Sequence, residues 1–316
     1  MGKFNYGGQA VMEGVMMRGS KNMAVAVRKP DGEIVIHTEP VDPRIYTGPV
    51  SRWPFLRALP MLWDTLVLGM RTLIFSADVA LAEEEEFEFK GPLAWGTVAV
   101  SLTLGVAIFF VAPALLVGLV DRYLASDILS NLVEGIIRLS LIVGYIWAVG
   151  FMPDIRRVFA YHGAEHKTVN AYEAGAPLEA AAVDTFTTLH PRCGTGFLLV
   201  VAVISVLIFS LLGRPGMVWR ILSRILLIPV IAGLGYEVIK FSAAHQNNCL
   251  VRWFLTPSLA LQRLTTREPD QDMLEVAITA LKRVLVEEGL TSAAAEPVGV
   301  TSDAQPTEAV ASLPRS

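Results

Sequence analysis

The chain has 316 residues, 53% of them hydrophobic, and a mean hydropathy of +0.49, an apolar share that exceeds the usual one of a soluble domain and favours a membrane protein. Its formal net charge is −4, and residues 83–86 alone supply four negative charges, so the charge does not suggest nucleic-acid binding. Two cysteines, Cys193 and Cys249, do not resemble the disulfide framework of a secreted domain.

Residues 1–50 are expected to contain a glycine-rich loop followed by a β-hairpin. Glycines surround short apolar pairs in residues 5–19, which favours a loop; in the alternative, Gln9, Glu13 and Arg18 fold back onto a functional site. Residues 23–28 and 33–38 have the composition of strands, and the Lys-Pro-Asp-Gly sequence between them favours a turn because proline fixes one dihedral and glycine accepts a positive one.

Residues 51–90 predict an amphipathic helix at the membrane surface and an acidic linker. Apolar residues recur at helical spacing between 51 and 80, while Arg57, Asp64 and Arg71 interrupt any uncharged span. A helix with one apolar and one charged face is typical of the bilayer interface.

Residues 91–250 predict a membrane domain with four spans, and the overall fold class is a mainly α membrane protein. Residues 93–120 carry no charge and exceed the roughly 20 residues that a spanning helix needs. Residues 131–152 are apolar apart from Glu134 and Arg138, which stand four apart and are expected to pair. Residues 195–213 and 221–243 supply the third and fourth spans.

The distribution of basic residues predicts the orientation of these spans, with both termini and the loop 152–195 in the cytoplasm. Four arginines fall on the opposite side: Arg122, Arg214, Arg220 and Arg224. The expected cytoplasmic side has the larger set: Lys3, Arg52, Arg57, Arg71, Lys90, Arg156, Arg157, Lys167, Arg192, Arg252, Arg263 and Arg267.

Residues 251–290 predict a C-terminal amphipathic helical region. Apolar residues follow 3.6-residue spacing over 272–288, and Gly289 stands where a helix would stop. This helix needs a cover for its apolar face, so a protein partner is one interpretation. The Ala, Pro, Ser and Thr bias of 291–316 predicts a disordered tail.

The chemistry centres on His162-x-x-Glu165-His166 in a polar helix predicted from about 155 to 174. On a helix, the three side chains project from roughly one face. Zinc needs neutral imidazoles at a fixed separation, and a neighbouring carboxylate can act as general base on a metal-bound water. The residue order is that of an inverted zincin motif, so His162 and His166 are candidate ligands and Glu165 the candidate base.

A third ligand has to come from elsewhere in the chain. Glu173 shares the helix face of His162, His190 and Cys193 stand just before the third span, and Glu237 is a carboxylate at membrane depth. If His190 and Cys193 both join the two histidines, the ligand set is closed and the metal is structural.

Three segments together resemble the YqhQ-like family of uncharacterised bacterial multi-pass membrane proteins: residues 8–19, 161–167 and 190–195. The resemblance covers about residues 5–290 and implies a location in the bacterial inner membrane. It also marks positions that are expected to matter: Glu13, Arg18, His162, Glu165, His166, His190 and Cys193.

These features predict a membrane-embedded zinc hydrolase at the cytoplasmic face, acting on a peptide or lipid-linked substrate. A non-enzymatic scaffold or assembly factor with a structural metal or polar cluster is the alternative. A transporter that uses Glu134, Arg138 and Glu237 ranks third. Membrane lipid is an expected partner, and nucleic acid is not. The sequence leaves open whether the chain forms a homo-oligomer.

Overall fold

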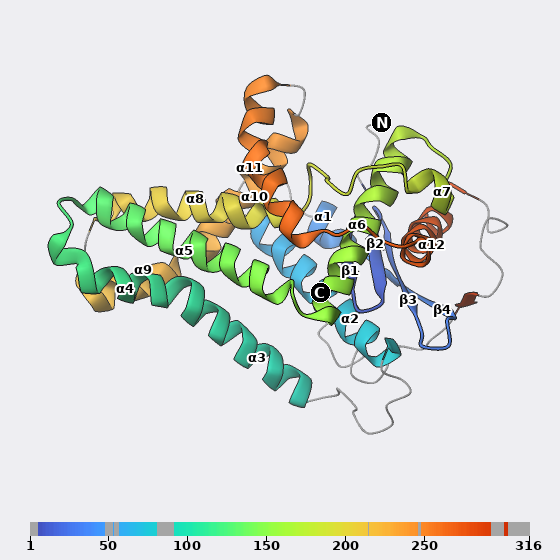
Figure 1. Cartoon of the computed structure of the whole chain (residues 1–316), viewed down its shortest axis with the longest axis horizontal. Coiled ribbons are helices and arrows are strands. Elements are labelled where there is room, and N and C mark those ends of the chain that lie inside the picture. Colours follow the sequence, from blue (N-terminus) through green and yellow to red (C-terminus); the bar gives the residue numbers. More distant parts are fainter. Residues whose placement is uncertain are drawn as a thin grey trace.

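The computed structural model describes residues 6–47, 53, 57–80, 92–213, 215–245, 248–291 and 300–302. The acidic run 83–86 and most of the expected tail lie outside these residues. The described chain is mainly helical and has two parts, a compact α/β unit and an elongated bundle of apolar helices that extends from it (Figure 1).

The N-terminal sheet is an antiparallel meander of β1 (Gly7–Val11), β2 (Gly14–Arg18), β3 (Asn22–Arg28) and β4 (Ile34–Pro40). The hairpin predicted from the second half of this region is confirmed as β3 and β4. The glycine-rich loop predicted for 5–19 is wrong, because β1 and β2 form a second hairpin there. A short strand, β5 (Val300–Ser302), pairs in parallel with β4 inside the segment predicted to be disordered.

The glycines in β1 and β2 allow neighbouring backbones to pack closely. They therefore do not indicate a flexible loop. A Cβ on Gly8 would lie 2.4 Å from the Met16 carbonyl oxygen, and a Cβ on Gly14 would lie 2.3 Å from that of Ala26. Such distances are too short for any side chain, so only glycine lets the neighbouring backbone approach this closely. Sequence alone does not distinguish this use of glycine from flexibility.

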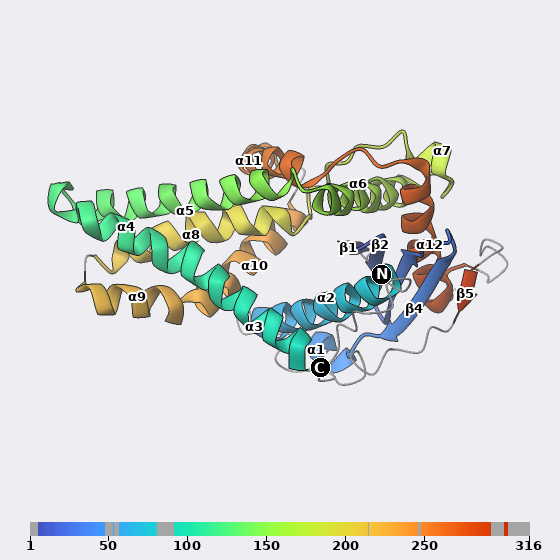
Figure 2. The same cartoon turned by 60° about the horizontal axis from the view of Figure 1, so that its bottom comes forward.

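Both faces of the sheet are covered by helices (Figure 2). Helices α6 (Pro153–Ala174) and α12 (Gln271–Glu287) pack on one face, and α2 (Ala58–Ala80) packs on the other. Successive residues of a strand point to opposite faces, so Ala24 and Ala26 belong to the core under α6 and α12, while Met23, Val25 and Val27 belong to the core under α2. The predicted helices at 155–174 and 272–288 are confirmed.

Helix α2 buries two charged side chains together with apolar ones such as Leu68 and Phe75, and it exposes other apolar side chains. Asp64 and Arg71 are buried; Asp64 lies 3.5 Å from Arg18 and Arg71 lies 3.3 Å from Glu39. The exposed apolar side chains are Leu59, Trp63, Leu66 and Leu73. The helix is also long and apolar enough to cross a membrane, whereas the sequence predicted only a surface helix.

Helices are present at all four predicted spans. Among the described residues, three helices are long and apolar enough to cross a membrane, α2 included, or four if the bent pair α9–α10 counts as one; several apolar helices thus suggest a membrane protein. α8 coincides with the third predicted span but has only 17 residues. The bundle elements are α3 (Pro92–Val106), the π-helical turn η2 (Ala107–Val111), α4 (Ala112–Val120), α5 (Asp127–Val149), α8 (Thr195–Leu211), α9 (Met217–Leu226) and α10 (Ile228–Ala244).

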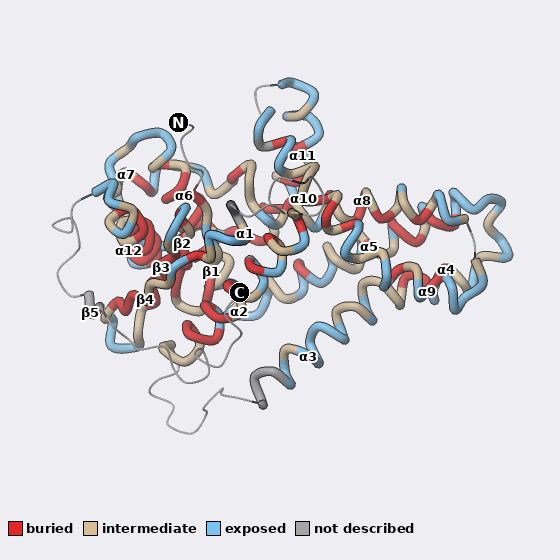
Figure 3. Tube along the Cα trace, turned by 180° about the vertical axis from the view of Figure 1, so that it is seen from behind, coloured by how far each residue is buried: buried red, intermediate tan, exposed pale blue. Residues whose placement is uncertain are grey.

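Exposure differs between the two parts of the molecule. Figure 3 shows α3 as largely exposed and the interior of the α/β unit as buried. Two short helices, α1 (Pro43–Thr47) and α7 (Ala180–Val183), complete the α/β unit, and α11 (Cys249–Thr265) projects from the side of the bundle (Figure 1).

An ion-pair network lies inside the bundle, centred on Glu134, which is 1% exposed. Its carboxylate accepts hydrogen bonds from Arg138 at 2.9 Å, from Arg220 at 3.1 Å and from Arg224 at 2.8 Å. The predicted pairing of Glu134 with Arg138 is therefore confirmed. Arg138 also donates to the Phe109 carbonyl in the π-helical turn, which ties the first long apolar helix to the same network.

Candidate functional site

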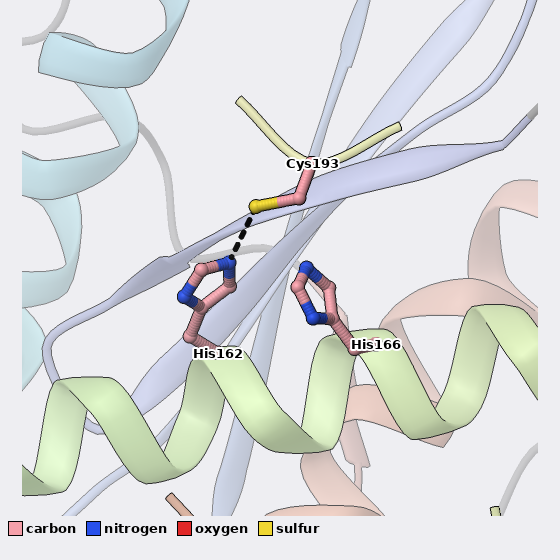
Figure 4. Close-up of side chains that lie close together, drawn as sticks. All are labelled: His162, His166 and Cys193. Atoms are coloured by element: carbon pink, nitrogen blue, oxygen red, sulfur yellow. Dashed lines mark hydrogen bonds between the residues drawn. The ribbon is translucent and has the colours of Figure 1, made fainter. Parts of the chain in front are cut away.

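Helix α6 carries the two candidate histidines side by side. Pro153 occupies its first turn and Gly175, with φ of 74°, ends it in the left-handed conformation that glycine adopts without strain. The four-residue spacing then stacks His162 and His166 on one face, with ring centroids 4.3 Å apart (Figure 4).

Cys193 reaches the histidines from the loop that precedes α8. Its Sγ lies 3.2 Å from His162 Nε2, and the backbone N–H of Thr195 donates to the same sulfur at 3.3 Å. One ligand atom each from His162, His166 and Cys193 falls within 4.8 Å of the other two. Tetrahedral Zn–N bonds of about 2.0–2.1 Å and Zn–S bonds of about 2.3 Å hold the ligand atoms roughly 3.4–3.6 Å apart, so the widest pair would have to approach by about 1.2–1.4 Å.

Backbone carbonyls fix the orientation of both imidazole rings. His162 Nδ1 lies 2.9 Å from the Thr265 oxygen, and His166 Nδ1 lies 2.6 Å from the Thr188 oxygen. A carbonyl can only accept, so each Nδ1 carries the proton and donates it. In a neutral ring this leaves the lone pair on Nε2, the arrangement that outer hydrogen bonds impose on metal-binding histidines.

A glycine in α6 allows the carbonyl of Thr265 to reach His162. The segment after α11 crosses α6 at Gly163, where an added Cβ would lie 2.1 Å from the Arg267 backbone oxygen. The backbone N–H of Arg267 donates to the Phe159 carbonyl at 2.9 Å, which holds the crossing in place. Gly163 lowers helix propensity, and this close crossing is the structural reason for its presence.

The side-chain amides of Gln262 and Asn170 hold the loop that carries His190 and Cys193. Neither residue is among the candidates that the sequence pattern indicates. Gln262, buried on α11, accepts from the His190 N–H at 3.0 Å and donates to the His190 carbonyl at 2.9 Å. Asn170 on α6 donates to the carbonyls of Thr187 and Leu189. A glutamine in an apolar stretch was a weak signal for such a role, and the carbonyls of Thr188 and Thr265 have no sequence signal at all.

Glu165 is buried between α6 and the sheet, with 5% of its surface exposed. Its Oε2 lies 3.5 Å from His166 Nε2, and a Cβ on Gly8 would lie 2.9 Å from its Cγ. Because His166 Nδ1 donates to a carbonyl, its Nε2 presents its lone pair beside the carboxyl group of Glu165.

His190 and Glu173 lie next to this cluster. The His190 ring is 5.6 Å from that of His166, and its buried Nε2 has no hydrogen-bond partner among the described residues. Glu173 Oε2 lies 3.8 Å from that nitrogen, too far for a hydrogen bond, and Glu173 also pairs with Arg192. Burial raises the pKa of Glu173, but interactions with His190 and Arg192 outweigh it and lower the pKa to about 2.

Glu237 lies apart from the cluster of His162, His166 and Cys193. It forms two hydrogen bonds with Arg57, at 2.8 and 2.6 Å, which join α10 to the chain entering α2. Glu237 is one of the ligands that the sequence pattern predicts, and in the structure its carboxylate is paired with Arg57.

In the described part of the chain, the contacts of the N-terminal candidates lie around the cluster of His162, His166 and Cys193. Glu13, in the β1–β2 turn with φ of 49°, pairs with Arg157 at 2.5 Å and accepts from the Tyr161 hydroxyl at 3.3 Å. Burial and the Glu13 charge raise the pKa of Tyr161. Gln9 packs against Gly69 of α2, and Arg18 pairs with Asp64, as described above.

The fold and the site define a class of protein: a bundle of long apolar helices that carries, on an attached α/β unit, a convergent set of two imidazoles and one thiol. Such a soft donor set suits zinc among the common metal ions. The family model described as "Protein of unknown function (DUF1385)" matches residues 53–287. The chain belongs to this family.

A relative in Bacillus subtilis (strain 168), described as "Uncharacterized protein YqhQ", is 31% identical over 298 residues. The match covers 90% of this chain and 94% of the relative. The predicted resemblance to the YqhQ-like family is therefore confirmed. No solved structure gives a significant match to the chain.

Proposed function

We propose that the protein is a zinc-dependent hydrolase of the membrane, with His162, His166 and Cys193 as the metal ligands. The observation that carries the proposal is the orientation of the two rings. Both Nδ1 atoms donate to backbone carbonyls, so both Nε2 atoms are available next to Cys193 Sγ. Preorganised imidazoles beside a thiol are what a zinc site requires.

Three protein ligands leave one position of a tetrahedral zinc for water, which is the arrangement of catalytic zinc sites. Zinc would supply a water molecule of increased acidity. Glu165, at 3.5 Å from His166 Nε2, would accept a proton from that water and return it to the leaving group. The water oxygen would form a new bond to the substrate carbonyl carbon as the scissile bond breaks.

The proposed location is the cytoplasmic face of a bacterial inner membrane, with both termini in the cytoplasm. Support comes from the apolar helices and from the excess of basic residues in the segments predicted to be cytoplasmic. A substrate at the bilayer surface, a peptide or a lipid-linked molecule, suits a site next to the apolar helices.

The first experiment is the zinc content of detergent-purified protein by plasma mass spectrometry. We expect close to one zinc per chain in the wild type, loss of zinc in His162→Ala and Cys193→Ala, and retention in Glu165→Gln. His37→Ala is the matched control, since this histidine pairs with Glu39 on β4. A wild-type protein without zinc after the metal is added back would overturn the proposal.

Hydrolysis of an activated ester, 4-nitrophenyl acetate, then tests the role of Glu165. Removal of a general base lowers the rate by about 10²- to 10⁴-fold, so Glu165→Gln should lose the zinc-dependent rate while its zinc content is unchanged. Equal rates in the two proteins would assign Glu165 a structural role.

A structural metal in a non-enzymatic scaffold is the second candidate, and one observation favours it. His190 is 4% exposed and its Nε2 has no hydrogen-bond partner among the described residues, so it could supply a fourth ligand. In that case His190→Ala would lose zinc together with thermal stability. For the hydrolase, His190→Ala should keep its zinc.

A further inference from the structure

An open apolar groove runs along α5 and ends beside α11. It has a volume of about 550 Å³. Five lining residues follow one stripe of α5, and the sixth comes from the last turn of α11: Leu139, Ser140, Val143, Gly144, Trp147 and Leu264. With 1.5 Å of rise per residue, the α5 stripe extends over about 12 Å.

The lining and position of the groove indicate which kind of ligand it binds. α5 is one of the helices long and apolar enough to span a membrane, and the groove is open to the surroundings of the protein. Only Ser140 contributes a polar side chain to the lining, and Trp147 at one end stacks edge-on against Phe151 at 4.8 Å. Apolar walls that end in aromatic rings are typical of the boundary between acyl chains and headgroups.

The last lining residue of the groove is next in sequence to a residue of the candidate site. Leu264 immediately precedes Thr265, whose carbonyl oxygen accepts the hydrogen bond from His162 Nδ1. A chain seated along α5 would therefore have its polar end near the His162 side of the site.

An exposed cation precedes the last lining residue of the groove in sequence. Arg263, one residue before Leu264 in the last turn of α11, has no ion-pair partner among the described residues. A guanidinium group binds a phosphate through paired hydrogen bonds. An anionic headgroup next to Arg263 and an acyl chain in the groove together describe a phospholipid.

We propose that the groove between α5 and α11 binds one acyl chain of an anionic phospholipid, with Arg263 contacting its phosphate, and that this lipid class presents the substrate to the site. The proposal rests on the proposed function, because it names the substrate class of the same centre. The ligand of the groove is accordingly a lipid and not a soluble peptide.

Photo-crosslinking tests the groove directly. Full-length protein in nanodiscs is labelled with a phosphatidylglycerol that carries a diazirine in its acyl chain, and crosslinks are mapped by peptide mass spectrometry. We expect them to concentrate on residues 139–147 and the peptide containing Leu264. The corresponding phosphatidylcholine probe should label these peptides less, and Arg263→Gln should remove the difference between the two probes.

Gly144→Phe provides the blocking variant. No atom lies within 4 Å of a Cβ added at Gly144, so the ring can fill the groove without displacing the backbone. Crosslinks in the groove should be lost. Gly96→Phe on α3, where the added Cβ also meets open space, is the matched control and should leave them unchanged. Ser140→Phe is a second blocking variant if Gly144→Phe does not fold.

Zinc content, measured on the same samples, separates this proposal from the proposed function. Crosslinks spread evenly over α3 and α5, or unaffected by both blocking variants, would overturn the groove proposal even if zinc is bound. Localised crosslinks in a protein that binds no zinc would support the lipid site and refute the hydrolase. Equal labelling by the two probes in the wild type would remove the role of Arg263.

Discussion

Replacement of Glu134 by glutamine should destabilise the helical bundle strongly. The carboxylate, 1% exposed, is hydrogen-bonded by Arg138, Arg220 and Arg224. Asp121 is the other carboxylate of this network and contacts Arg220. Glu134→Gln leaves three buried guanidinium groups against one carboxylate.

The expected loss of stability follows from the burial of these ion pairs. At 4 Å and an effective dielectric constant of about 20, each ion pair is worth about 4 kcal/mol before desolvation. Loss of one partner from a buried pair costs about 3–5 kcal/mol net. With a factor of ten for each 1.4 kcal/mol, the unfolded fraction should rise roughly 10²- to 10⁴-fold.

Unfolding by sodium dodecyl sulfate in mixed micelles, followed by tryptophan fluorescence, measures this free energy. Glu275→Gln is the matched control: Glu275 pairs with Arg28 at 2.7 Å but has half of its side chain exposed. This surface pair should contribute at most about 1 kcal/mol. A Glu134→Gln protein within about 1 kcal/mol of the wild type would refute the argument from buried charge.

Three further outcomes are expected. Gly163→Ala should displace the segment that crosses α6 and release the carbonyl that orients His162. Zinc binding should then weaken by about 10- to 100-fold, as measured by equilibrium dialysis. Gly144→Ala is the control and should leave zinc binding unchanged. Removal of zinc by a chelator should lower the thermal midpoint of the wild type and leave that of His162→Ala unchanged. Burial raises the pKa of Glu288, but hydrogen bonds from Tyr6 and Ser20 outweigh it and lower the pKa. The stabilisation by Glu288 should therefore be complete above its ordinary pKa of 4.5 and be lost as the pH falls through the lowered value. Thermal midpoints of the wild type and Glu288→Gln should accordingly differ at pH 7 and converge in acid.

Local signals in the sequence predicted most of the helices and one of the two hairpins. The polar helix predicted from about 155 to 174 is α6, and the four-residue spacing of its histidines placed them on one face. The same spacing predicted the pair of Glu134 and Arg138. These properties depend on backbone dihedrals and on neighbours within one helical turn, so the residues themselves specify them.

Tertiary structure decided which donors meet, because that choice depends on packing between distant segments. The sequence left Cys193, His190, Glu173 and Glu237 as alternatives, and only Cys193, 31 residues from His162, comes within reach of both histidines. The carbonyl that orients His162 comes from a residue 103 positions away. The burial of Asp64 and Arg71 on α2 likewise depends on the sheet beneath it, since amphipathic spacing defines two faces but not which one the protein covers.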